Sequence, residues 1–177
     1  MRPGLDDAGT FTPLAVAVLT VSDTRTQETD HSGRLLAERA SEAGHRVVAQ
    51  LIVKDDVDLL EAQLRAWVAN PGIDVVIATG GTGITARDVT PEAFHAVFEK
   101  ELPGFGELFR QKSLASIGLA SLLSRATAGV ARGTLLFALP GSTGACRDAW
   151  DGILRELLDS RYRPCNLAEL LPRLRED

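Results

Sequence analysis

Residues 74–92, DVVIATGGTGITARDVTPE, constrain the fold more than any other part of the sequence. The segment begins with an apolar run at residues 75–78, rich in β-branched side chains, which is typical of a strand buried on both faces of a parallel sheet. A glycine-rich loop at residues 80–83 follows, and Thr90 and Pro91 then predict a helix with Thr90 as its N-cap. Open α/β folds use this order of strand, glycine turn and helix to hold a ligand that carries phosphate.

The composition of the loop indicates how such a ligand could be held. A loop with little Cβ bulk lets backbone N–H groups close on an anion, and the residues predicted to do so are Gly80, Gly81, Thr82 and Gly83. Arg87 could pair with a phosphate oxygen or with a neighbouring carboxylate. Asp88 suggests Mg²⁺, because a carboxylate beside a phosphate is favourable only with a cation between them. The alternative is a solvated loop whose glycines only make a turn.

The loop matches neither of the two common nucleotide-binding motifs. It lacks the Gly-Lys-Ser/Thr ending of a P-loop, and its glycine spacing differs from the G-x-G-x-x-G of a dinucleotide fold. Standard NTPases and dehydrogenases are therefore poor matches. The chain also offers no Ser-His-Asp or Cys-His arrangement for nucleophilic catalysis.

Two other predicted strands also end in polar residues. The strand at residues 14–21 is followed by Ser22 and Asp23, and the strand at residues 46–53 is followed by Asp55. Ligand sites of α/β proteins are usually built just beyond the carboxyl ends of the strands, so Asp55 and Asp88 could share a metal ion. Both segments could instead be ordinary loops that precede helices.

A second glycine turn follows a predicted β-hairpin. The strands at residues 125–130 and 134–139 form the hairpin, and Gly141 and Ser142 come directly after it, with Ser142 placed to cap a helix. Two such turns suggest a ligand with more than one phosphate, or two phosphorylated ligands. A turn that serves packing alone remains the alternative.

The apolar periodicity predicts helices at residues 33–43, 58–69, 91–100 and 107–124. Asp58 and Glu61 could form a capping box at the start of the second helix. The fourth helix is predicted to be interrupted near Gly118.

The remaining pattern predicts a flexible tail at residues 1–12 and a single domain at residues 13–177. A net charge of −5 argues against nucleic-acid binding, which usually requires a basic surface. No apolar run approaches the roughly 18 residues of a membrane span. We therefore expect a cytoplasmic protein.

Four segments form a recognisable set: GGTGITARDVTPEA at residues 80–93, ELPGFGE at residues 101–107, LPGST at residues 139–143 and RPCN at residues 163–166. Together they resemble the molybdenum cofactor biosynthesis protein B (MoaB) family. The resemblance runs from about Leu14 to Leu174, and the first motif is shared with the wider molybdopterin-binding family that includes MogA.

The resemblance implies a three-layer α/β/α sandwich, with a mostly parallel central sheet and a small β-hairpin, assembled as a trimer or hexamer. Active relatives bind molybdopterin and Mg-ATP, transfer AMP to the terminal phosphate of the pterin and release pyrophosphate. By motif, the two family aspartates fall on Asp55 and Asp88. Ser22, Asp23, the loop at residues 80–83, Gly141 and Ser142 match loops that face the pterin and the phosphates.

One position departs from the catalytic pattern, because this chain has Lys54 where many active relatives have proline before the first aspartate. The second aspartate motif, Arg87-Asp88-Val89-Thr90-Pro91, is intact. Two functions follow: a molybdopterin adenylyltransferase that uses Mg²⁺ and ATP, or a non-catalytic protein that binds molybdopterin and hands it on.

Overall fold

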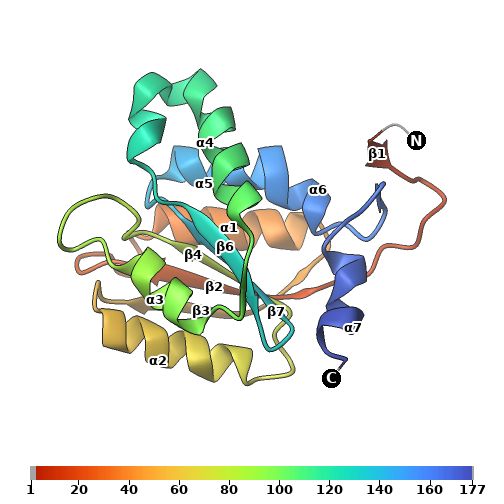
Figure 1. Ribbon diagram of the computed structural model, residues 1–177, viewed down its shortest axis with the longest axis horizontal. Coiled ribbons are helices and arrows are strands. Elements are labelled where there is room, and N and C mark those ends of the chain that lie inside the picture. Colours follow the sequence, from red (N-terminus) through yellow and green to blue (C-terminus); the bar gives the residue numbers. More distant parts are fainter. Residues whose placement is uncertain (1–2, 177) are drawn as a thin grey trace.

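The computed structural model describes residues 3–176, in which a six-stranded mixed sheet lies between two layers of helices (Figure 1). The strand order is β3-β2-β4-β7-β6-β5. Four strands are parallel: β2 (Ala15–Val21), β3 (Arg46–Val53), β4 (Val75–Thr79) and β7 (Thr134–Leu139). The antiparallel strands are β6 (Thr127–Ala131) and β5 (Lys100–Glu101). The predicted α/β/α fold, with its mostly parallel sheet and hairpin, is confirmed.

The central strands are buried on both faces, as their continuous apolar composition predicts. Every residue of β2, β4 and β7 is buried, whereas β3 lies at the edge of the sheet and has only exposed and half-buried positions. The hairpin turn between β6 and β7 places Arg132 and Gly133 at positive φ, which matches the twist of the two strands.

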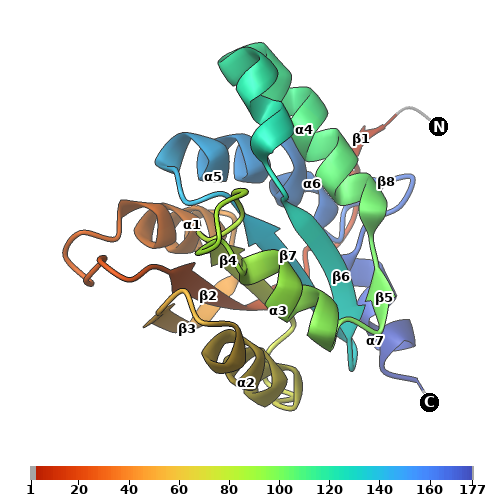
Figure 2. The ribbon, with the colours of Figure 1, turned by 60° about the vertical axis from the view of Figure 1, so that its left-hand side comes forward.

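The helices divide into two layers (Figure 2). One face of the sheet is covered by α1 (His31–Glu42), α4 (Pro103–Ile117) and α5 (Thr143–Ala149), and the other by α2 (Val57–Val68) and α3 (Thr90–Val97). The helix α5 continues through the π-helical turn η2 (Trp150–Leu154) into α6 (Arg155–Leu157). No helix within residues 3–176 combines the length and the apolar character needed to cross a membrane.

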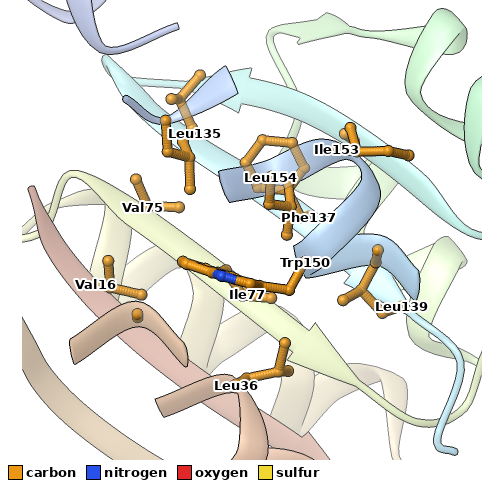
Figure 3. Packing of buried hydrophobic residues seen from close by; sticks show 14 of the residues in the cluster. Val16, Leu36, Val75, Ile77, Leu135, Phe137, Leu139, Trp150, Ile153 and Leu154 are labelled. Carbon is orange, nitrogen blue, oxygen red and sulfur yellow. The ribbon is translucent and has the colours of Figure 1, made fainter. Parts of the chain in front are cut away.

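Alternate residues of each strand fill one of two cores. In the larger core, Val16, Val75 and Ile77 face Leu36 of α1 and Trp150 of η2 (Figure 3). In the smaller core, the intervening strand residues pack against Leu60 and Leu64 of α2 and Phe94 of α3. This two-sided burial explains why the central strands are apolar at every position.

The predicted interruption near Gly118 occurs where α4 gives way to the 3₁₀ helix η1 (Gly118–Leu123). Gly118 has a φ of 59°, a left-handed conformation that ends the α-helix. The two helices form an arm that projects from the sheet layer in Figure 1.

The predicted helix starts are wrong in detail. Helix α4 begins at Pro103, four residues before the predicted start at residue 107, because proline is well suited to a first helical turn. Asp56 caps α2, because its carboxylate accepts hydrogen bonds from the backbone N–H groups of Asp58 and Leu59 at 3.1 and 3.0 Å, in place of the expected capping box. Val89 occupies the N-cap of α3 without a side-chain bond, and Thr90 is already helical. The helix also ends at Val97, earlier than predicted, because the chain extends into β5.

The N-terminal segment lies against the C-terminal part of the chain. Strand β1 (Gly4–Leu5) pairs with β8 (Tyr162–Arg163), and the Phe11 ring lies 5.2 Å from the Arg161 guanidinium. The chain then ends with η3 (Ala168–Leu170) and α7 (Leu171–Leu174). The flexibility expected for residues 1–12 stays a prediction, and residues 1 and 2 lie outside the described part.

Candidate functional site

The candidate site lies beyond the carboxyl ends of the four parallel strands. Strand β2 is flanked by β3 on one side and β4 on the other, so the order of connections reverses beside it. In open α/β sheets a crevice forms at such a point, outside the strand ends. The loops are tied together there, because the Ser22 amide donates to the Val53 carbonyl at 2.9 Å and the Gly80 amide to the Leu139 carbonyl at 3.0 Å.

The first glycine loop requires glycine at two positions for steric reasons. Gly80 and Gly81 have φ values of 112° and 63°, and a Cβ at Gly80 would overlap the backbone carbonyl oxygen of Val21. A Cβ at Gly81 would overlap the hydroxyl of Thr90 and lie 3.0 Å from a carboxylate oxygen of Asp55. The loop therefore passes between the end of β2 and the start of α3 with no room for a side chain.

Thr90 has a role that differs from the predicted cap. Its hydroxyl donates to the Gly80 carbonyl at 2.8 Å, and its backbone N–H donates to the Gly81 carbonyl at 3.0 Å. Thr90 is fully buried, so these bonds fix the loop directly against the first turn of α3.

Asp88 is held inside the same loop. One of its carboxylate oxygens accepts hydrogen bonds from the Thr85 backbone N–H at 2.8 Å and from the Thr85 hydroxyl at 2.6 Å. A Cβ on Gly83 would lie 2.8 Å from that oxygen. The hydrogen bonds from Thr85 lower the pKa of Asp88 below its ordinary value, so the group is a fixed carboxylate at neutral pH.

Arg87 pairs with Asp23, which decides between the two partners that the sequence left open. The ion pair links the glycine loop to the segment after β2. Hydrogen bonding from Arg87 lowers the pKa of Asp23. Asp23 in turn raises the pKa of Arg87.

Asp55 has the opposite electrostatic environment. Partial burial, and then the negative charge of Asp23, raise the pKa of the Asp55 carboxyl, with a smaller contribution from Asp88. A cation near Asp55 would relieve this repulsion.

The donor set fits Mg²⁺ bound jointly with a ligand. In the described residues no three Asp, Glu, His or Cys side chains gather closely enough to hold a metal ion by themselves. Mg²⁺ is usually held by one or two carboxylates together with substrate phosphates, and Asp55 and Asp88 could supply those carboxylates beside the glycine loop.

A cavity of about 630 Å³ joins the two glycine loops. Gly81, Thr82, Gly83 and Asp88 line it from the first loop, and Gly141 and Ser142 line it from the second. A Cβ on Gly141 would lie 3.2 Å from the Gly80 Cα, and the Thr79 hydroxyl donates to the Pro140 carbonyl at 2.9 Å. The loops are therefore in direct contact, and Ser142 caps α5 as predicted by accepting from the Ala145 amide at 3.1 Å.

Five of the predicted site residues do not line this cavity. Gly80 packs against the end of β2. Ser22, Asp23 and Asp55 follow β2 and β3, and Arg87 joins them through its ion pair with Asp23. Gly81 connects the two regions, because it lines the cavity and also lies beside Asp55. The site thus has a carboxylate-rich edge and an adjoining cavity.

Two arginines of the site were missed by sequence reasoning. Arg125 precedes β6 and clamps the first loop, donating to the carbonyls of Gly83 and Asp88 at 2.6 Å each and pairing with Glu92. Arg147 of α5 is the one basic side chain among the described residues that line the cavity. Arg147 lies five residues after Ser142, outside the i+3 and i+4 spacing of neighbours on a helix, and no local signal connects Arg125 to a loop about 40 residues earlier.

Comparison with known proteins gives one consistent result. Residues 17–160 match the model of a family described as a probable molybdopterin binding domain. The chain is 51% identical over 156 residues to molybdenum cofactor biosynthesis protein B of Escherichia coli (strain K12), covering 88% of this chain and 92% of that protein.

Solved structures of such proteins have the same fold. A crystal structure of molybdenum cofactor biosynthesis protein B has a TM-score of 0.83 and 42% identity, covering 92% of this chain and 96% of that chain. The tungsten cofactor synthesizing protein MoaB from Pyrococcus furiosus has a TM-score of 0.75 and 38% identity, with coverages of 93% and 98%. The range matched by the family includes every residue of the candidate site described above.

Proposed function

This chain belongs to the molybdenum cofactor biosynthesis protein B family and contains its molybdopterin-binding domain, and on that premise we propose that it transfers AMP from Mg-ATP to the terminal phosphate of molybdopterin. The observation that carries the proposal is the single cavity in which both glycine loops meet a fixed, ionised Asp88. Its volume of about 630 Å³ is in the range of small-molecule sites.

The proposed reaction is a nucleotidyl transfer. An oxygen of the terminal phosphate of molybdopterin forms a bond to the α-phosphorus of ATP, and the bond from that phosphorus to the β-phosphate oxygen breaks. Pyrophosphate leaves with the electron pair of that bond. The attacking phosphate is already ionised near neutral pH, so the step needs no strong general base.

What such a reaction requires is alignment of phosphates and compensation of negative charge. The backbone N–H groups of Gly81–Gly83 and of the Gly141–Ser142 turn would bind phosphate oxygens. Arg147 would add a positive charge from the wall of the cavity. Arg125 would keep the first loop in the shape that aims its N–H groups.

Asp55 and Asp88 are the residues that would hold Mg²⁺. When bound, the ion would neutralise charge on the phosphates of ATP. The raised pKa of Asp55 supports this assignment, because it comes from burial and from the charge of Asp23, and a bound cation would offset both. The lowered pKa of Asp88 supports it as well, because that group is ionised and already oriented by Thr85.

The variant Asp88→Asn tests the proposal against a non-catalytic role. We expect it to bind molybdopterin as the wild type does and to lose pterin-dependent pyrophosphate release by about 100-fold or more, because a charged group that acts on the phosphates is gone. The exposed α1 residue Glu38 supplies the control, and Glu38→Gln should change neither quantity. A protein that only carries molybdopterin would release no pyrophosphate in any of the three forms.

We extend the proposal to assembly as a homo-oligomer, a trimer or hexamer as the resemblance implies. Large apolar side chains are exposed on the α4–η1 arm, notably Leu119 at 84% and Leu122 at 79%. Such exposed apolar surface commonly marks a contact between proteins. Light scattering should give a multimer for the wild type and a smaller species for Leu119→Glu combined with Leu122→Glu, whereas Leu59→Glu on α2 should leave the mass unchanged.

A further inference from the structure

Ser113 is a buried hydroxyl without a hydrogen-bond partner. It lies in the interior of α4 with 2% of its surface exposed, and its Oγ is one of two buried side-chain polar atoms in the described residues that make no hydrogen bond. A buried polar group without a partner costs free energy, so its presence calls for an explanation.

The position of Ser113 suggests what the hydroxyl is for. Ser113 is among the residues that line the 630 Å³ cavity, together with the two glycine loops and Asp88. Of its five neighbours on the wall formed by α4 and η1, four are apolar, namely Phe109, Ile117, Ala120 and Leu123, and the fifth is Ser116. The cavity therefore has a polar part that suits phosphate and an apolar wall that contains one unused hydroxyl.

The lack of a hydrogen-bond partner is specific to Ser113, because the next serine of α4 has partners. Ser116 also lines the cavity, but its hydroxyl has Asp148 Oδ2 at 2.9 Å and the Ser113 carbonyl at 3.1 Å as acceptors. Its single O–H donor is therefore already used within the protein. Of this pair, only the Ser113 hydroxyl has its donor free for a ligand.

We propose that Ser113 is a positioning residue that hydrogen-bonds the polar edge of a flat, fused nitrogen heterocycle held on the α4–η1 wall. Such a ring presents two apolar faces for packing and a rim of donors and acceptors for the hydroxyl. The inference rests on the proposed function, in which two ligands carry a ring of this kind, the pterin of molybdopterin and the adenine of ATP. The same contact would orient the ring while the glycine loops bind its phosphates.

Separate titrations of molybdopterin and of ATP with Ser113→Ala distinguish the two sources of the ring. We expect the affinity for one ligand to fall about three- to tenfold, the usual effect of one lost hydrogen bond, and the other affinity to stay unchanged. The melting temperature should stay equal or rise, because alanine removes a buried hydroxyl that has no native partner. Ser121→Ala, at a buried serine of η1 outside the cavity lining, should leave both affinities unchanged.

The outcomes separate this inference from the proposed function. If the wild type binds both ligands and Ser113→Ala alters neither affinity, the role of Ser113 is wrong and the proposed function stands. Weaker binding of both ligands with a lower melting temperature would show that the hydroxyl supports α4 itself, which also overturns the inference. If the wild type fails to bind molybdopterin, the proposed function fails, and this inference fails with it.

Discussion

Asp55 and Asp88 are two aspartates of one site whose environments shift their pKa values in opposite directions. Hydrogen bonds from Thr85 lower the pKa of Asp88, whereas burial and the charge of Asp23 raise the pKa of Asp55. Asp88 therefore adds stability above its unfolded-state pKa and loses that contribution as the pH falls through its lowered folded-state value. The contribution of Asp55 is complete below its unfolded-state pKa and is lost as the pH rises through its raised folded-state value.

Asparagine substitutions at these two positions should change the melting temperature in opposite directions. At pH 7 in the presence of a chelator, we expect Asp55→Asn to raise it and Asp88→Asn to lower it. Both groups are partly exposed, so screening limits each effect to about 1 kcal/mol, or roughly 2–4 °C for a chain of this length. Thermal unfolding followed by circular dichroism provides the measurement, and shifts of the same sign would contradict the electrostatic account.

Local sequence was enough to identify the site residues that belong to the glycine loops. Gly80, Asp88 and Ser142 are recognisable because strand, turn and helix signals adjoin them. Arg125 and Ser113 were not recognised, since Arg125 bonds to residues that are distant in sequence and Ser113 reaches the cavity only through the fold. The pairing of Arg87 with Asp23, 64 residues apart, was open for the same reason.

The first glycine loop depends on the tight contact between strand ends. Gly80 has a positive φ, and its Cα lies so close to the Val21 carbonyl that a methyl group would overlap backbone atoms. Backbone cannot move aside as a flexible side chain can, so the contact is a strict requirement for glycine.

Gly80→Ala should therefore destabilise the protein by about 3 kcal/mol or more, which corresponds to roughly 6–12 °C in melting temperature. Gly104→Ala provides the matched control, because a Cβ at Gly104 in the first turn of α4 would meet no atom within 4 Å. That variant should be neutral or stabilising by up to about 1 kcal/mol. Equal melting temperatures for the two variants would show that the loop can relax.

Helix positions followed from apolar periodicity, but helix starts did not. The sequence around Thr90 satisfies the preferences for an N-cap, and yet its hydroxyl donates to Gly80 in the neighbouring loop. At α2, the sequence favoured Asp58 as the start, and the chain instead places Asp56 at the cap. Where a side chain has several possible hydrogen-bond partners, the packing around it decides which partner it bonds to.

The whole fold was predictable to the level of its layers. Buried apolar strands indicated a parallel sheet, and the family resemblance implied the three layers. The strand order β3-β2-β4-β7-β6-β5 and the two cores confirm both. The pairing of β1 with β8 had no signal in the sequence, because it joins two short segments about 160 residues apart. Contacts of that kind form only because the folded domain places its N-terminal and C-terminal segments side by side.

The central claim is that the site joins AMP to the terminal phosphate of molybdopterin. The most direct measurement is to incubate the protein with molybdopterin and ATP labelled at the α-phosphate, with Mg²⁺, and to quantify adenylylated molybdopterin and pyrophosphate together. The account predicts equal amounts of the two products for the wild type and neither for Asp88→Asn. Pyrophosphate without an adenylylated pterin, or no product from a wild type that binds molybdopterin, would contradict it.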